Sequence, residues 1–205
     1  MTELDLPAEI AAERQAFTEV LAALPGSAWD EPSLCAGWRV RDVVAHMTMP
    51  FRYSRMRFVS ELLRDRGNFN RMADRCARRD AARLSSAELA AVHADNVENP
   101  WRPPGGGYDG ALTHDVIHGL DCTTALGITR EIPAARLRVV LDGLTTERAR
   151  KHFGVDVAGR ELHATDLDWS FGTGEPIPAT GQQLVLLLGG RVVPGLRPLS
   201  RESAT

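Results

Sequence analysis

The chain has 205 residues, a length that suits one domain or one domain with a small appendage. Hydrophobic residues make up 43% of it, enough for a sizeable core, but no apolar run is long enough to span a membrane. The formal net charge of −3, with basic and acidic residues interspersed, provides no electrostatic case for nucleic-acid binding.

Amphipathic helices dominate the chain as far as residue 151, because apolar residues recur there every three or four positions. The second of these helices contains Pro50, which is expected to kink or interrupt it because proline lacks an N–H group and crowds the preceding turn. Its apolar spacing resumes beyond the proline and includes Met56, Val59 and Leu63. The predicted helices cover residues 6–24, about 38–65, 69–79, 86–97 (with Ser85 and Glu88 placed to cap it), 109–126 and 133–151.

The pattern changes after Gly154. Short strand-like segments bounded by glycine and proline occur over residues 162–169 and at Ile177. One more helix is predicted over residues 180–188, with Thr180 as its cap, and residues 189–205 are predicted to be a loop and a flexible tail. The sequence therefore predicts a mainly α protein, with a bundle of four or five helices over residues 1–152 and a small α+β domain over residues 153–205.

Three histidines form the candidate chemical site. His114 and His118 are four residues apart, so in a helix both imidazoles lie on one face and can reach one metal ion. One more nitrogen, from His46 on an earlier helix, would complete three protein ligands and leave one coordination position open, which is typical of catalytic metal sites. The spacing alone also fits a surface histidine pair and a hydrogen-bonded core histidine at position 46.

Acidic residues accompany these histidines. Asp121 follows His118 by three positions, where it can accept a hydrogen bond from an imidazole N–H. Asp42 precedes His46 by one helical turn. If both helical faces point into the bundle, ligands from two helices converge, as they do in other metal sites built inside helical bundles.

The cysteines and the N-terminus indicate a cytoplasmic protein. Cys35, Cys76 and Cys122 are an odd number without CxxC spacing, so a disulfide framework is not expected. The first 15 residues lack a basic region followed by an apolar stretch, so no signal peptide is expected. The arginines around Cys76 favour a lowered thiol pKa, but an inert, partly buried thiol is the preferred interpretation.

Other aromatic and histidine residues are assigned structural roles. Trp38 and Trp169 are interpreted as core aromatics rather than substrate platforms. His93, His152 and His163 have no metal-like spacing and are interpreted as structural or exposed.

Three motifs in the correct order resemble one known family. The segment WDEPSLCAGWRVRDVVAH resembles the N-terminal signature of the mycothiol-dependent maleylpyruvate isomerase-like family, which belongs to the DinB-like superfamily of metal-binding four-helix bundles. HDVIHGLD, followed by ALG, resembles the second metal motif of the family, and the segments GREL, ATDLDW and GGR resemble its short C-terminal domain. These motifs occupy residues 29–46, 114–121, 125–127, 159–169 and 189–191, so the resemblance covers most of the chain.

The resemblance implies a DinB-like up-and-down four-helix bundle that holds a divalent metal through His46, His114 and His118. Zinc is the commonest metal, with nickel, manganese and iron as alternatives. The isomerase branch has a glutamate at the position of His114, whereas a histidine there matches the broader DinB-like three-histidine pattern. Arg191 matches a family arginine that can pair with a carboxylate of a thiol cofactor or an acidic substrate; the alternative is a solvated surface arginine.

The leading functional hypothesis is a metal-dependent enzyme that activates a low-molecular-weight thiol, by resemblance mycothiol, for isomerisation or thiol transfer on a small molecule. Three neutral imidazoles leave the metal its full charge, so a thiol at the open position loses its proton near neutral pH. Two alternatives are a non-catalytic protein that binds a metal or a small ligand, and an interaction module whose histidines are incidental. Either a monomer or a homodimer is compatible with the sequence.

Overall fold

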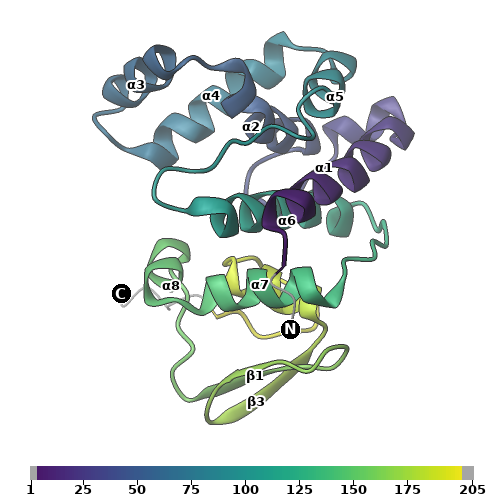
Figure 1. The fold of residues 1–205 in the computed structure, drawn as a ribbon, viewed down its shortest axis with the longest axis vertical. Coiled ribbons are helices and arrows are strands. Elements are labelled where there is room, and N and C mark those ends of the chain that lie inside the picture. Colours follow the sequence, from purple (N-terminus) through teal and green to yellow (C-terminus); the bar gives the residue numbers. More distant parts are fainter. Residues whose placement is uncertain (1–3, 200–205) are drawn as a thin grey trace.

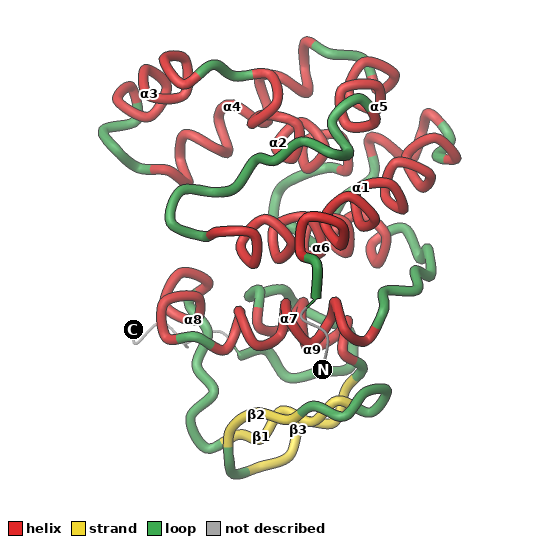
Figure 2. The backbone as a smooth tube through the Cα atoms, in the orientation of Figure 1, coloured by secondary structure: helices red, strands yellow, loops and turns green. Residues whose placement is uncertain are grey.

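A computed structural model describes residues 4–199 and contains, within them, nine α-helices, one short 3-10 helix and a three-stranded sheet. Helices α1–α6 form the larger part of the molecule, and α7–α9 lie below them with the sheet (Figure 1; Figure 2). The predicted mainly α fold, with a bundle followed by a small α+β segment, is confirmed. The elements are α1 Leu6–Ala23, η1 Gly26–Asp30, α2 Val40–Arg52, α3 Arg55–Arg64, α4 Phe69–Arg83, α5 Ser86–Ala94, α6 Gly107–Ala125, α7 Ala134–Thr145, α8 Glu147–Phe153, β1 Arg160–Ala164, β2 Ser170–Gly172, β3 Glu175–Ala179 and α9 Gly181–Leu188.

Two predicted caps are present. At the start of α5, the side chain of Ser85 accepts a hydrogen bond from the backbone N–H of Glu88, whose carboxylate accepts one in return from the backbone of Ser85. Thr180 and Gln183 form the same reciprocal capping box at the start of α9. Each box satisfies two N–H groups that a helix start leaves without partners.

The predicted helix over residues 38–65 is in fact two helices. Pro50 lies inside the last turn of α2, and the backbone N–H of Tyr53 still donates to Met49, so the helix continues past the proline. The break follows at Tyr53 and Ser54, which are extended, and the Ser54 hydroxyl caps α3. The expected interruption is therefore present, but it falls at Tyr53 and Ser54 rather than at Pro50, and the helix does not continue unbroken to residue 65. The predicted helix over residues 133–151 divides in the same way at Thr146, which caps α8.

Helix α3 does not bury its apolar stripe. Met56 is 84% exposed, Leu63 71% and Val59 51%, and no residue of this helix is buried. It packs against α4 at the edge of the bundle (Figure 1). Helical spacing predicted that this segment is a helix, but spacing contains no information on which neighbour covers the apolar face.

Helix α6 is the centre of the fold. It packs against α1 and α2 on one side and against α7 and α9 on the other. One hydrophobic core joins α6 to α7, α9 and β1 through Leu112, Leu141, Leu187 and Leu162, and a second core lies between α1 and α2 around Phe17. The first core contains residues from both sides of the predicted domain boundary at residue 152, and that boundary stays a prediction.

The sheet has the order β2-β1-β3, with β1 antiparallel to β2 and parallel to β3. Only two residues link β2 to β3, so the chain crosses the start of β1 directly. Gly174, at φ 130°, makes this crossing possible, because a Cβ there would lie 2.2 Å from the carbonyl oxygen of Gly159. The predicted loop over residues 189–199 contains no helix or strand, and residues 200–205 of the predicted tail lie outside the described residues.

A buried ion network joins α1 to the segment that follows α6. Glu13 is fully buried, and its two carboxylate oxygens accept hydrogen bonds from Arg130 at 2.7 Å and Arg136 at 2.8 Å. Arg136, on α7, also pairs with Glu9 at 2.8 Å. Gly119 on α6 faces the Arg130 guanidinium so closely that a Cβ would lie 2.6 Å from it. This network therefore connects α1 to Arg130 and to α7 through the buried charges of Glu13, Arg130 and Arg136, and Arg130 also packs against α6 at Gly119.

The longest helices do not resemble membrane spans. Within residues 4–199 we find no helix whose length and apolar character would let it cross a bilayer.

Candidate metal site

The three predicted histidines converge between α2 and α6. His46 lies in the middle of α2, and His114 and His118 lie one turn apart on the facing side of α6. Ring nitrogens from the three side chains all lie within 4.8 Å of one another, and the Nε2 atoms of His46 and His114 are 3.3 Å apart. The sequence prediction that two helices bring these imidazoles together is confirmed.

This spacing fits a metal ion. Two nitrogens bound to a tetrahedral zinc at about 2.05 Å are separated by about 3.4 Å, close to the distance between His46 and His114. Three nitrogen donors on two helices leave at least one position for another ligand, as catalytic zinc sites do. The residues present therefore fit a divalent cation.

Carboxylates orient the two imidazoles of α6. The Nδ1 atom of His118 is 3.0 Å from Asp121 Oδ2, as the sequence predicted, and the Nδ1 atom of His114 is 2.9 Å from Asp115 Oδ1. Because an ionised carboxylate only accepts hydrogen bonds, both Nδ1 atoms carry the proton and both Nε2 lone pairs remain free for a metal. Histidine 46 differs: its Nδ1 is buried and has no hydrogen-bond partner among residues 4–199. Asp42 accepts from Arg39 at the start of α2 instead.

Each of these two carboxylates also accepts hydrogen bonds from an arginine. The Nε and Nη2 atoms of Arg191 donate to the two oxygens of Asp121 at 2.9 and 2.7 Å. Arg14 Nε donates to Asp115 Oδ2 at 2.7 Å. Both carboxylates are buried and each is balanced by its own guanidinium, so neither adds an uncompensated negative charge beside the imidazoles.

Burial favours the neutral form of two of the three imidazoles, those of His46 and His118. It lowers the pKa of His46 well below 6.5, and the neighbouring His118 and His114 add to the effect. Burial also lowers the pKa of His118 to about 4, although Asp121 opposes the shift. Burial acts to raise the pKa values of Asp115 and Asp121, but hydrogen bonds from His114 and Arg191 respectively outweigh it and hold both below 3.8. Neutral imidazoles beside ionised carboxylates are the protonation states that metal binding requires.

The metal-free protein is expected to lose stability as the pH falls from about 6.5 to about 4. Burial lowers the folded-state pKa of both His118 and His93 to about 4, whereas a histidine in the unfolded chain titrates near 6.5. The unfolded state therefore binds more protons in this window, and the free energy of unfolding falls on acidification. The loss reaches up to about 1.4 kcal/mol per pH unit for each histidine.

Urea denaturation of the metal-free protein at several pH values in this window measures the effect. In the variant His93→Gln the dependence on pH should be shallower, because one of the depressed groups is gone. A free energy of unfolding that stays constant from neutral to acidic pH contradicts the prediction.

Two tryptophans flank the histidines. The Trp101 ring centroid is 5.3 Å from that of His114, and the Trp38 ring is 5.2 Å from His46. Trp169 is a buried core residue as predicted, but Trp38 is half-buried and lies at the site. Trp101 was not predicted as a site residue, because it lies in the irregular segment between α5 and α6, where no periodicity relates it to a helix face.

The cysteines are poorly suited to be nucleophiles. All three are free thiols, as predicted. Burial, reinforced by Asp121, raises the pKa of Cys35 to about 11, and burial raises the pKa of Cys122 well above its usual range. Cys76 is fully buried on α4, 3.6 Å from the Arg79 guanidinium. Neither Cys35 nor Cys122 is therefore favoured as a thiolate near neutral pH.

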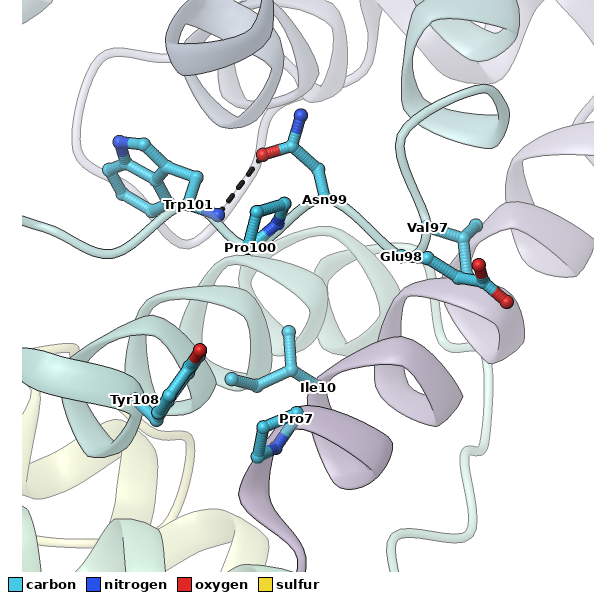
Figure 3. A pocket seen from close by; sticks show the side chains of 8 residues that line it. All are labelled: Pro7, Ile10, Val97, Glu98, Asn99, Pro100, Trp101 and Tyr108. Carbon is cyan, nitrogen blue, oxygen red and sulfur yellow. Dashed lines mark hydrogen bonds between the residues drawn. The ribbon is translucent and has the colours of Figure 1, made fainter.

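A small pocket of about 60 Å³ lies beside residues 95–106, which join α5 to α6 and which we call the Trp101 segment (Figure 3). It opens between the start of α1 and Tyr108 on α6, and the backbone N–H of Trp101 donates to Asn99 at its edge. A wider depression of about 480 Å³ near Arg130 and Gln182 contains none of the three histidines. Neither cavity includes the cluster itself, which lies between Trp38 and Trp101.

Comparisons with known proteins identify the family and the fold. The family model of the mycothiol maleylpyruvate isomerase N-terminal domain matches residues 10–121, which is more than half of the chain and includes all three histidines. Crystal structures of the mycothiol-dependent maleylpyruvate isomerase and of a histidine-to-alanine mutant of it are similar in fold, each with a TM-score of 0.58. They are 17% and 16% identical in sequence, and each match covers 96% of this chain and 95% of the other. No curated protein matches the chain. On the strength of the family match, the chain belongs to the mycothiol maleylpyruvate isomerase N-terminal domain family.

Proposed function

We propose that this protein is a divalent-metal-dependent enzyme that activates mycothiol at a three-histidine site for isomerisation or thiol transfer on a small molecule. The observation that carries the proposal is the convergence of His46, His114 and His118, with the two α6 imidazoles held by buried carboxylates. Mycothiol is the proposed thiol because the similar solved structures are those of a mycothiol-dependent isomerase.

Zinc is the proposed metal, with nickel, manganese or iron as alternatives. Three neutral nitrogen donors suit zinc and the other borderline cations better than magnesium or calcium, which prefer oxygen. A divalent cation held by the three histidines supplies the positive charge that stabilises the thiolate form of a thiol at the open position.

The chain's own residues provide orientation and exclude water. Asp115 and Asp121 keep the Nε2 lone pairs of His114 and His118 directed at the cluster. The half-buried rings of Trp38 and Trp101 remove water from its sides, which strengthens electrostatic interactions inside it. Arg191 donates to Asp121 and to the backbone of Gly189. Because a guanidinium has five N–H groups, Arg191 can also offer one to an acidic substrate or thiol cosubstrate.

The reaction class follows from the nucleophile. A thiolate that adds to an activated double bond converts it to a single bond, rotation about that bond becomes free, and expulsion of the thiolate restores the double bond in the other geometry. If the adduct is protonated and released before expulsion, the product is a thioether and the outcome is thiol transfer. Both outcomes need the same site, so the substrate decides between isomerisation and transfer.

Mycothiol binding to the zinc form is expected to release a proton. The proposed ligands are neutral, so the cation favours an anionic fourth ligand and binding should strengthen as the pH rises toward the thiol pKa. Above that pKa the gain should level off, because the free thiol is already ionised. Calorimetric titrations at several pH values, each in two buffers of different ionisation enthalpy, measure the released proton.

S-methylated mycothiol is the matched control, since it has no proton to lose at sulfur and should show no buffer dependence. Heat that is absent at every pH, with zinc confirmed in the protein, would contradict thiol activation and favour a non-catalytic metal-binding protein. Turnover of maleylpyruvate by the zinc form, tested with and without mycothiol, then separates an isomerase from a thiol-binding protein.

A further inference from the structure

Arg14 is a charged residue in the middle of an apolar helix face. On α1 it follows Ile10 by four positions and precedes Phe17 by three, so it shares their buried stripe. It is only 1% exposed. A guanidinium in such a place costs several kcal/mol of desolvation unless it is paired and hydrogen-bonded. Its partners therefore indicate what it contributes.

The first partner of Arg14 is Asp115, which in turn bonds to a histidine of the cluster. Arg14 Nε donates to Asp115 Oδ2 at 2.7 Å, and the other oxygen of Asp115 is 2.9 Å from His114 Nδ1. The His114 ring is thereby held with its Nε2 atom 3.3 Å from His46 Nε2. Arginine, carboxylate and imidazole form a chain from α1 to the centre of the cluster, parallel to the one that Arg191 and Asp121 form behind His118.

The other partners of Arg14 are backbone carbonyl groups of the Trp101 segment. Arg14 Nη1 donates to the carbonyl oxygen of Asn99 at 2.6 Å and to that of Asn96 at 3.4 Å. Asn99 in turn accepts a hydrogen bond from the backbone N–H of Trp101 (Figure 3). The ring centroid of Trp101 lies 5.3 Å from that of His114. The guanidinium of Arg14 thus holds the carboxylate that bonds to His114 Nδ1. The same guanidinium binds the Trp101 segment, whose tryptophan ring contacts His114.

We infer that Arg14 is a positioning residue that acts through Asp115 to hold His114 in its metal-binding orientation. The inference rests on the proposed metal site. Replacing the group that hydrogen-bonds a metal-bound histidine typically lowers metal affinity by roughly 10- to 100-fold. Arg14 is one contact further out, and its removal allows the Asp115 carboxylate to rotate and releases the Trp101 segment.

Cobalt binding tests the inference, because the affinity and the visible absorption of the bound ion report the ligands without any turnover. Arg14→Met is expected to weaken cobalt binding about 10-fold, the lower end of the range for a direct partner, and to change the absorption spectrum. Arg136→Met is the matched control. Arg136 is also a buried arginine paired with carboxylates of α1, but it has no contact with a histidine of the cluster. Its loss should leave cobalt affinity unchanged.

The same substitution in a His114→Glu background separates positioning from general structural support. A glutamate can still bind the metal but has no Nδ1–H for Asp115 to hold, so Arg14→Met should weaken cobalt binding there much less than in the wild type. An equal loss in both backgrounds would overturn the inference, as would wild-type affinity and spectrum in Arg14→Met.

If Arg14→Met does not fold, Arg14→Met combined with Asp115→Asn replaces the buried pair with neutral groups and leaves no charge without a partner. The amide is a weaker acceptor than the carboxylate, so the same loss of cobalt affinity is expected, and wild-type affinity in this variant overturns the inference. Failure of the wild-type protein to bind cobalt would instead contradict the proposed metal site and remove the basis of the inference.

Discussion

Replacing His118 with alanine is expected to lower the affinity for zinc by more than about 100-fold, since altering an outer partner of a ligand already costs roughly 10- to 100-fold. The imidazole is one of only three nitrogen donors in the cluster. The fold should tolerate the change, because Asp121 keeps its paired hydrogen bonds to Arg191 when the imidazole is gone. Competition with a zinc chelator of known affinity measures the loss, and thermal denaturation of the metal-free forms shows whether the variant is folded.

His152→Ala is the control for this experiment. His152 is an exposed histidine on α8 and is not part of the cluster, so its removal tests for non-specific surface binding of zinc. Its zinc affinity should equal that of the wild type. Equal zinc affinity and stoichiometry in the wild type and in His118→Ala would rule out this histidine as a ligand.

Replacing Glu13 with glutamine is expected to lower the free energy of unfolding by about 3–5 kcal/mol, the usual cost of removing one partner from a buried ion pair. The substitution preserves the size of the side chain but removes the charge that Arg130 and Arg136 share. Arg136 retains Glu9, but Arg130 loses its ion-pair partner, and its Nη1 already has no hydrogen-bond partner among the described residues. Urea denaturation at neutral pH measures the difference.

The matched control is Glu19→Gln on the same helix. Glu19 is exposed, and its contact with Gln15 is a surface hydrogen bond, so this change should alter stability by less than about 0.5 kcal/mol. Denaturation midpoints that coincide for Glu13→Gln and the wild type would mean that the buried network does not stabilise the fold.

The three-histidine cluster could be predicted from sequence because most of its geometry is local. Residues four apart on a helix share a face whatever surrounds it, so His114 and His118 had to lie together once the segment was helical. The same rule placed Asp121 beside His118. The third histidine is not local to this helix, so spacing offered His46 only as one candidate, and the motif over residues 29–46, which resembles a known family, strengthened that prediction.

The contacts of the residues that support the cluster could not be predicted from helical periodicity. Arg14 could have been suspected, because a charge between Ile10 and Phe17 interrupts an apolar stripe, but the stripe does not say which carboxylate it meets. Asp115 is adjacent to His114 in sequence, and neighbours on a helix normally point in different directions. Its side chain nevertheless reaches His114 Nδ1, while Arg14 on α1 binds its other oxygen.

The sequence by itself determined the mainly helical class, the positions of the caps at Ser85 and Thr180, and the pairing of imidazoles on α6, since all of these depend on interactions within a few residues. The tertiary structure decided the rest: the exposure of the apolar stripe of α3, and the meeting of α1, α2 and the Trp101 segment around α6. The physical reason is that periodicity specifies which side of a helix is apolar, whereas the choice of the neighbour that covers it depends on packing between segments distant in the chain.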